Sequence, residues 1–181
     1  MARYHFITRW VLDASVQETY AIIKDSSSLA RWWPSVYLDV KTIYPGLANG
    51  LGKQVALWTK GYLPYTLRWN FEVVEIIPFQ KIVLEASGDL EGRGIWTFEG
   101  SERGCIIHFD WNINFKKEYI SWFGFILRPI FRLNHQWAMN KGLQSLKLEI
   151  MRRQGIPGVP QPPLPTYPHR AIQRRERYPD S

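Results

Sequence analysis

The chain has 181 residues and a formal net charge of +7 at pH 7, with 45% hydrophobic residues and nine each of Trp, Tyr and Phe. This length suits one domain, and the apolar content is too high for a disordered chain. A single cysteine, Cys105, excludes an internal disulfide framework. The alternating N-terminus MARYHFITRW is not typical of a signal peptide, so we expect a cytoplasmic protein.

The most apolar stretch, residues 119–133, is not expected to span a membrane. It is shorter than the roughly 20 residues that a bilayer requires, and it carries Arg128, Pro129 and Arg132. Together with the basic C-terminal end, it leaves open a transient contact with an anionic membrane surface. The basic residues are not gathered on one element, so nucleic-acid binding is not expected.

The first elements follow from periodicity and capping signals. Residues 3–12 alternate, which predicts a strand with Tyr4, Phe6, Thr8 and Trp10 on one face. Ser15 precedes Glu18 by three residues, the spacing of a capping box, and predicts a short helix over 15–24. A second helical turn is expected over 29–33, where Pro34 ends it.

The middle of the chain changes to a period of two. Strands are predicted near 36–44, 52–60, 65–77, 81–87, 93–100 and 105–115, with Gly- and Pro-containing breakers between them. Short connections favour an antiparallel meander. A long helix is expected from about 118 to 153, kinked or restarted at Pro129 and stopped at Gly155. We therefore predict one domain over 1–154 and an extended tail rich in Pro and Arg over 155–181.

These elements predict an α+β fold in which a seven-stranded antiparallel sheet wraps around the long C-terminal helix, with two short helices after the first strand. A sheet of this kind must bury one face, and only one long helix is available to cover it. Because sheets twist strongly, space remains between the sheet and the helix, where a ligand can lie.

This element order resembles the helix-grip fold of the START/SRPBCC-like superfamily. The resemblance rests on the segments LDASVQETYAIIKD, LARWWPSV and VVEIIP and on the terminal helix, and it covers about residues 3–153. The segments LPYTLRW, GDLEGRGIWTFEG and NHQWAMNKG are similar to a subgroup described as polyketide cyclase/dehydrase and lipid-transport-like. The resemblance implies a pocket for a lipid, hormone or polyketide, and it does not fix a reaction.

Aromatic residues dominate the candidate ligand-binding set, because they fall on elements that should line the space inside the grip. Each indole N–H needs a partner, and a wall of flat rings suits a polycyclic, prenyl or acyl ligand. Simple core packing is the alternative for any one of them. The candidate ligand-binding residues are Trp33, Tyr65, Arg68, Trp69, Trp96, Trp111, Asn134, His135, Trp137 and Met139.

Three of the polar and small candidates have specific roles to test. His135, Met139 and Gly142 share one face of the long helix, so a pocket-facing His135 is a candidate general acid or base. Its alternative is a core histidine hydrogen-bonded to a strand. Gly142 inside a helix indicates close approach by the sheet or a ligand. A buried Arg68 would hold a carboxylate, although Leu67 and Trp69 are the expected inward pair.

Three functions remain open. The first is binding or carrying an apolar small molecule. The second is a cyclase or dehydratase in which His135, helped by Asn134 or Tyr65, moves a proton. The third is a peripheral lipid-transfer protein that docks on membranes. No metal site and no cofactor are expected, because His and Cys show no ligand spacing and no phosphate-binding glycine motif occurs.

Overall fold

A computed structural model describes residues 3–115 and 124–167, with side chains from Pro129 onward in the last helix. It confirms the predicted α+β helix-grip architecture. The elements are β1 Arg3–Leu12, α1 Val16–Lys24, η1 Ser26–Ser28, α2 Leu29–Trp32, β2 Tyr37–Tyr44, β3 Gln54–Lys60, β4 Thr66–Ile77, β5 Lys81–Gly88, β6 Leu90–Ser101, β7 Gly104–Phe115 and α4 Gly124–Arg153.

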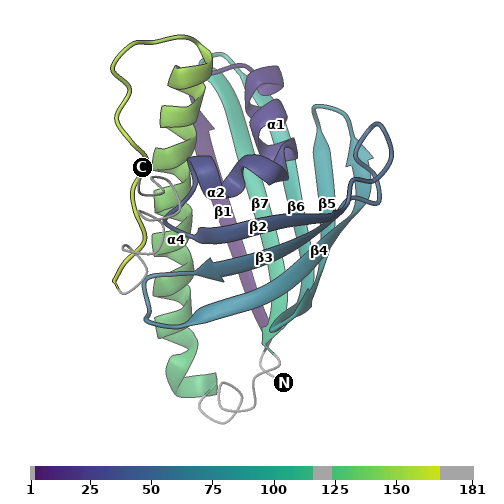
Figure 1. Cartoon of the computed structure of the whole chain (residues 1–181), viewed down its shortest axis with the longest axis vertical. Coiled ribbons are helices and arrows are strands. Elements are labelled where there is room, and N and C mark those ends of the chain that lie inside the picture. Colours follow the sequence, from purple (N-terminus) through teal and green to yellow (C-terminus); the bar gives the residue numbers. More distant parts are fainter. Residues whose placement is uncertain (1–2, 116–123, 168–181) are drawn as a thin grey trace, which may run out of the picture.

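The seven strands form one antiparallel sheet in the order β1-β7-β6-β5-β4-β3-β2. This order is a meander from β2 to β7, and β1 closes it by pairing with β7. The sheet curves around α4, which lies along its concave side. The short helices α1 and α2 lie at the end of the sheet where β1 ends (Figure 1). The grip predicted from the element order is therefore the observed arrangement.

Local signals placed the first helix correctly. The Ser15 hydroxyl accepts a hydrogen bond from the Glu18 amide at 3.2 Å, and the Glu18 carboxylate accepts one from the Ser15 amide at 2.9 Å. These two bonds are the predicted capping box. The reciprocal bonds satisfy donors that the first turn of a helix leaves free, which fixes where α1 begins.

The start of β6 differs most from the predicted strand boundaries. β6 begins at Leu90 instead of residue 93, because the strand pairing continues through Gly92. A Cβ on Gly92 would lie 2.0 Å from the carbonyl oxygen of Asn112 on β7, so the glycine permits close pairing instead of ending the strand. α4 is continuous through Pro129, and no restart occurs there. The predicted helical residues 118–123 lie outside the described residues.

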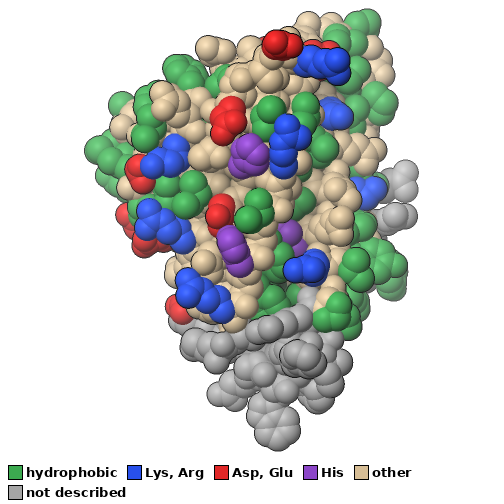
Figure 2. Space-filling model, turned by 180° about the vertical axis from the view of Figure 1, so that it is seen from behind, with side chains coloured by type: hydrophobic (Ala, Val, Ile, Leu, Met, Phe, Trp, Pro, Cys, Tyr) green, Lys and Arg blue, Asp and Glu red, His purple; other side chains and the backbone are tan. Residues whose placement is uncertain are grey.

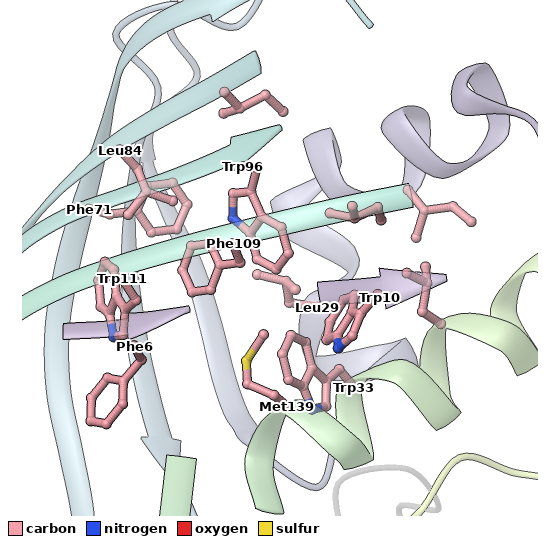
Figure 3. Packing of buried hydrophobic residues seen from close by; sticks show 14 of the residues in the cluster. Phe6, Trp10, Leu29, Trp33, Phe71, Leu84, Trp96, Phe109, Trp111 and Met139 are labelled. Atoms are coloured by element: carbon pink, nitrogen blue, oxygen red, sulfur yellow. The ribbon is translucent and has the colours of Figure 1, made fainter. Parts of the chain in front are cut away.

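The core lies on the concave face of the sheet. Along β7 every second residue from Cys105 to Phe115 is buried, in the alternation that the sequence predicts. Figure 3 shows the buried rings of β1, β6 and β7 facing Trp33 and Met139 across the interior. The opposite face of the sheet carries many charged residues, and Figure 2 shows basic and acidic side chains intermixed there with a few hydrophobic ones. On that face His5 lies 2.8 Å from Asp110.

After α4 the chain turns back and descends beside the helix toward the loop between β3 and β4 (Figure 1). Pro162 and Pro165 are buried in this segment. Arg152 donates to the carbonyl of Pro160, Lys60 donates to the carbonyl of Thr166 at 3.1 Å, and the Thr166 hydroxyl donates to the carbonyl of Tyr62 at 3.2 Å. Residues 156–167, called the strap below, therefore follow the surface as an extended chain.

No helix in the described part of the chain is long and apolar enough to cross a bilayer. The predicted membrane contact rests on residues 119–133 and on the basic C-terminal end. Residues 119–123 and 168–181 of those segments lie outside the described residues, so the contact stays a prediction.

Candidate functional site

A cavity of about 130 Å³ lies between the concave face of the sheet and the inner side of α4. It is called the grip cavity below. Small-molecule sites usually enclose roughly 300–1,000 Å³, so the grip cavity is compact. Its walls are mainly aromatic, and the rings come from the segment after α2, from β4, β6 and β7, and from α4. They include Trp33, Trp69, Trp96, Phe109, Trp111 and Phe131.

The sheet side of the grip cavity is a row of packed rings. Trp96 stacks on Phe109 with centroids 4.0 Å apart, Phe109 stacks on Trp111 at 5.5 Å, and Trp111 meets Trp69 at 5.7 Å. The indole N–H of Trp69 donates to the hydroxyl of Thr59 at 2.9 Å. The row therefore offers an apolar, rigid surface, because its rings support one another and the polar edge of Trp69 is occupied.

His135 forms part of the α4 side. Its ring stacks on Phe6 at a centroid distance of 4.2 Å, and its Nε2 lies 3.4 Å from the hydroxyl oxygen of Thr8. Burial lowers the pKa of His135 to about 4, because an imidazolium is poorly solvated in this setting. The ring is therefore neutral at pH 7, with one nitrogen as donor and one as acceptor.

Asn134 fastens a loop to α4 at the edge of the cavity. Its side-chain oxygen accepts a hydrogen bond from the Leu63 amide at 3.2 Å. A Cβ on Gly61 would lie 2.2 Å from that same oxygen, so the backbone of the β3–β4 loop, residues 61–65, is pressed against the helix. Gly61, Tyr65 and Asn134 all line the cavity, and the loop thus forms part of its rim.

Lys60 lies at the end of β3, where the same rim meets the strap. It is only 2% exposed, and its ammonium donates to the carbonyl of Thr166. Burial lowers its pKa. Burial likewise raises the pKa of Tyr37, a second polar side chain of the cavity wall. Both shifts have one cause, since this part of the molecule solvates charge poorly.

Eight of the ten predicted ligand-binding residues line the grip cavity. They are Trp33, Tyr65, Trp69, Trp96, Trp111, Asn134, His135 and Met139. The structure brings them together from elements that are up to about a hundred residues apart in sequence. Their contact with a ligand stays a prediction.

Arg68 and Trp137 lie elsewhere, and their predicted place in the pocket is corrected. Arg68 is exposed on the outer face of the sheet, with its guanidinium 5.1 Å from the centroid of the Trp58 ring. Neighbours along a strand point to opposite faces, so the inward Leu67 and Trp69 force Arg68 outward. Trp137 follows His135 by two positions, about 200° around a helix, and meets the exposed Tyr62 at 5.9 Å.

Several wall residues were not among the predicted set. Phe6 and Phe109 share the inward faces of strands that the alternation had identified, so the period of two could have found them. Lys60 gave no such signal. Its burial depends on the strap, which contributes Thr166 from more than a hundred residues further along the chain.

The predicted close approach at Gly142 is present, but its partner is Trp33. A Cβ on Gly142 would lie 2.3 Å from Cζ2 of the Trp33 ring. Trp33 is 2% exposed and also packs edge-on against Trp10 at 5.7 Å. The glycine therefore gives the Trp33 indole, which lines the cavity, room to pack against α4, and the group that approaches it does not belong to the sheet.

A sheet that grips one helix around an apolar cavity defines the helix-grip class of proteins. Within that class, the chain matches the family described as polyketide cyclase / dehydrase and lipid transport over residues 5–150. The match covers most of the chain, and the protein belongs to this family. No curated protein is significantly similar to it in sequence.

Solved structures share the fold at low sequence identity. The aromatase/cyclase ZhuI from Streptomyces sp. R1128 is 13% identical, with a TM-score of 0.66 over 86% of this chain and 98% of that one. The di-domain aromatase/cyclase StfQ of the steffimycin pathway is 15% identical, with a TM-score of 0.63 over 86% of this chain and 53% of that one. Ara h 8.0201 is 11% identical, with a TM-score of 0.58 over 83% and 99%.

Proposed function

We propose that the protein binds and carries an apolar small molecule of the aromatic, prenyl or acyl class in the grip cavity. The observation that carries this proposal is the row of stacked rings from Trp96 to Trp69, which forms an apolar wall beside a preformed cavity. The family description includes lipid transport, and apolar cavities with few polar groups are typical of ligand sites.

The volume of the cavity limits the ligand. At about 130 Å³ the cavity holds a compact ring system or part of a longer molecule. A larger ligand requires movement of the β3–β4 loop, which Asn134 and Trp137 on α4 and Thr166 on the strap hold in place. We therefore expect either a compact ligand or one that projects between this loop and α4.

A neutral, polarity-sensitive naphthalene dye tests the proposal. Ala138 lines the cavity, so Ala138→Phe fills it, whereas Leu133 is 65% exposed on the same helix and Leu133→Phe is the matched control. We expect wild type and Leu133→Phe to bind the dye alike, and Ala138→Phe to bind at least about tenfold more weakly, as loss of a buried apolar contact predicts. Equal binding by all three proteins would contradict the proposal.

A second candidate is a cyclase or dehydratase that uses His135. The supporting observation is a neutral imidazole in the cavity wall, 3.4 Å from the Thr8 hydroxyl oxygen, which is a suitable state for accepting a proton. Incubation with a short poly-β-keto thioester, followed by mass spectrometry, tests it. The expected result is loss of one water by the substrate with wild type and at least about a hundredfold slower reaction with His135→Gln, which still binds the dye. An unchanged rate in that variant would remove His135 from any mechanism.

A further inference from the structure

A second cavity lies on the far side of Trp96 from the grip cavity. Its volume is about 180 Å³, and it is called the side chamber below. The inward side chains of three strands form its floor, and the end of α1, Ser26 and the β2–β3 loop form its rim. The apolar floor consists of Phe71, Val73, Ile82, Leu84 and Trp96. Trp96 lines both cavities and separates them.

Ser26 gives the side chamber a polar group that has no partner. The residue is 6% exposed and lines the chamber, and its hydroxyl has no hydrogen-bond partner among the described residues. A buried hydroxyl without a partner costs free energy, so such groups usually bind a ligand or an ordered water. This hydroxyl can donate one hydrogen bond to an acceptor that enters the chamber.

Two lysines make the rim positive. Lys24 and Lys53 both line the chamber, and Lys24 forms no ion pair with a described residue. Its Nζ lies 6.0 Å from the centroid of the Tyr20 ring. Asp25 is the neighbouring carboxylate, and it is shared by Lys53, by Arg153 at 3.9 Å and by the Ser27 hydroxyl at 2.6 Å. The cationic charge at the rim therefore exceeds the anionic charge.

The β2–β3 loop, which forms part of the rim of the chamber, is held in its conformation by its own hydrogen bonds. The Leu47 amide donates to the Leu51 carbonyl at 2.8 Å, and the Gly50 amide donates to the Leu47 carbonyl at 2.7 Å. Gly46 has a φ of 77°, and a Cβ there would lie 2.6 Å from the Leu51 oxygen, so the turn requires glycine. Because this loop is already ordered by its own hydrogen bonds, less conformational entropy is lost when a ligand binds.

We propose that the side chamber is a second binding site, for a carboxylate that carries a short apolar chain or a single ring. The apolar part lies on Phe71, Val73 and Ile82, and the carboxylate accepts hydrogen bonds from Ser26 and from the lysines at the rim. The volume equals roughly six waters at about 30 Å³ each, which suits a chain of medium length. This site goes beyond the proposed function, because it does not require a ligand in the grip cavity.

Calorimetric titration with octanoate and with octan-1-ol tests the proposal. The two probes share a chain length and differ in charge, so wild type should bind octanoate about tenfold more tightly. The double variant Lys24→Gln, Lys53→Gln should lower octanoate affinity to that of the alcohol and leave the alcohol unchanged. Ser26→Ala should weaken octanoate several-fold. Lys147→Gln removes an exposed lysine on α4 that lies outside the chamber lining, so it is the control for loss of a lysine charge and should change neither affinity.

The Ala138→Phe variant separates this proposal from the proposed function. If the side chamber is the octanoate site, filling the grip cavity leaves octanoate binding intact, whatever it does to the naphthalene dye. Two results would overturn the proposal. One is equal affinity of wild type for octanoate and octan-1-ol. The other is loss of octanoate binding in Ala138→Phe together with normal binding in the double lysine variant. Thermal unfolding of each variant checks that the fold is retained.

Discussion

At the scale of single residues, Gly142 shows how one missing side chain shapes the grip. Alanine would normally stabilise a helix interior by up to about 1 kcal/mol relative to glycine. Here the added Cβ would lie 2.3–2.7 Å from three carbons of the Trp33 ring, which is buried and packs against Trp10 and Trp32. The free-energy cost of this steric clash should therefore exceed the gain in helix propensity.

We predict that Gly142→Ala lowers the free energy of unfolding by about 1–3 kcal/mol, the usual cost of overpacking a core. Urea denaturation followed by tryptophan fluorescence measures it. Gln144→Ala, an exposed position two residues along the same helix, is the control and should change stability by less than about 0.5 kcal/mol. A stabilised Gly142→Ala protein would show that Trp33 adjusts freely.

The candidate site could be predicted at residue scale wherever a strand face decided the direction of a side chain. Trp96 and Trp111 line the grip cavity because strict alternation fixes which residues point inward. α4 is different, because apolar residues occur on more than one of its faces. Leu133 is 65% exposed while Phe131 and Met139 are 5% exposed, so its apolar pattern does not tell which side meets the sheet. Trp137 was misplaced for that reason.

At the scale of elements, the β3–β4 loop is held from two sides. Asn134 on α4 accepts a hydrogen bond from the Leu63 amide, and Thr166 on the strap donates one to the Tyr62 carbonyl. The order of the strands and most of their limits could be predicted, because breakers separate them. The contact between the strap and this loop could not be predicted, because a proline-rich segment has no periodic pattern that indicates which part of the fold it packs against.

We predict that deleting residues 156–181 speeds hydrogen exchange at the Leu63 amide by at least about tenfold, since the loop then loses the hydrogen bond between Thr166 and Tyr62. Amides of β7 should keep their protection. Deletion of 168–181 only is the matched control, because it retains Thr166 and its bonds to Tyr62 and Lys60. Equal exchange in the two truncated proteins would mean that the strap does not restrain the loop.

At the scale of the whole molecule, the half-buried His135 links stability to pH. The folded protein has a pKa of about 4 at this residue, against an ordinary value of 6.5. Between these values the unfolded chain binds a proton that the folded chain does not. Stability must therefore fall as the pH drops from about 6.5 to about 4, and this contribution is constant outside that window.

We predict that wild type loses about 2 kcal/mol more than His135→Gln in free energy of unfolding between pH 7 and pH 5. Urea denaturation of both proteins at the two pH values measures the difference. Other titrating groups are common to both proteins, so they cancel in the comparison. An equal loss would mean that His135 is solvated well enough to be protonated in the folded state.

The overall architecture was predictable because every level of the sequence agrees on it. Capping at Ser15, alternation in β7 and the single long helix all point to one sheet around one helix. The division of the interior was not predictable. Two cavities separated by Trp96 result from how far each ring reaches into the interior, which depends on packing across several strands.

The strap fastens the rim of the grip cavity without being part of its wall. A segment in that position slows ligand association and ligand dissociation by the same factor, so a bound molecule stays longer and is also captured more slowly. The equilibrium constant stays the same. If the grip cavity holds a ligand as proposed, a single cut within the strap should speed both the entry and the release of that ligand.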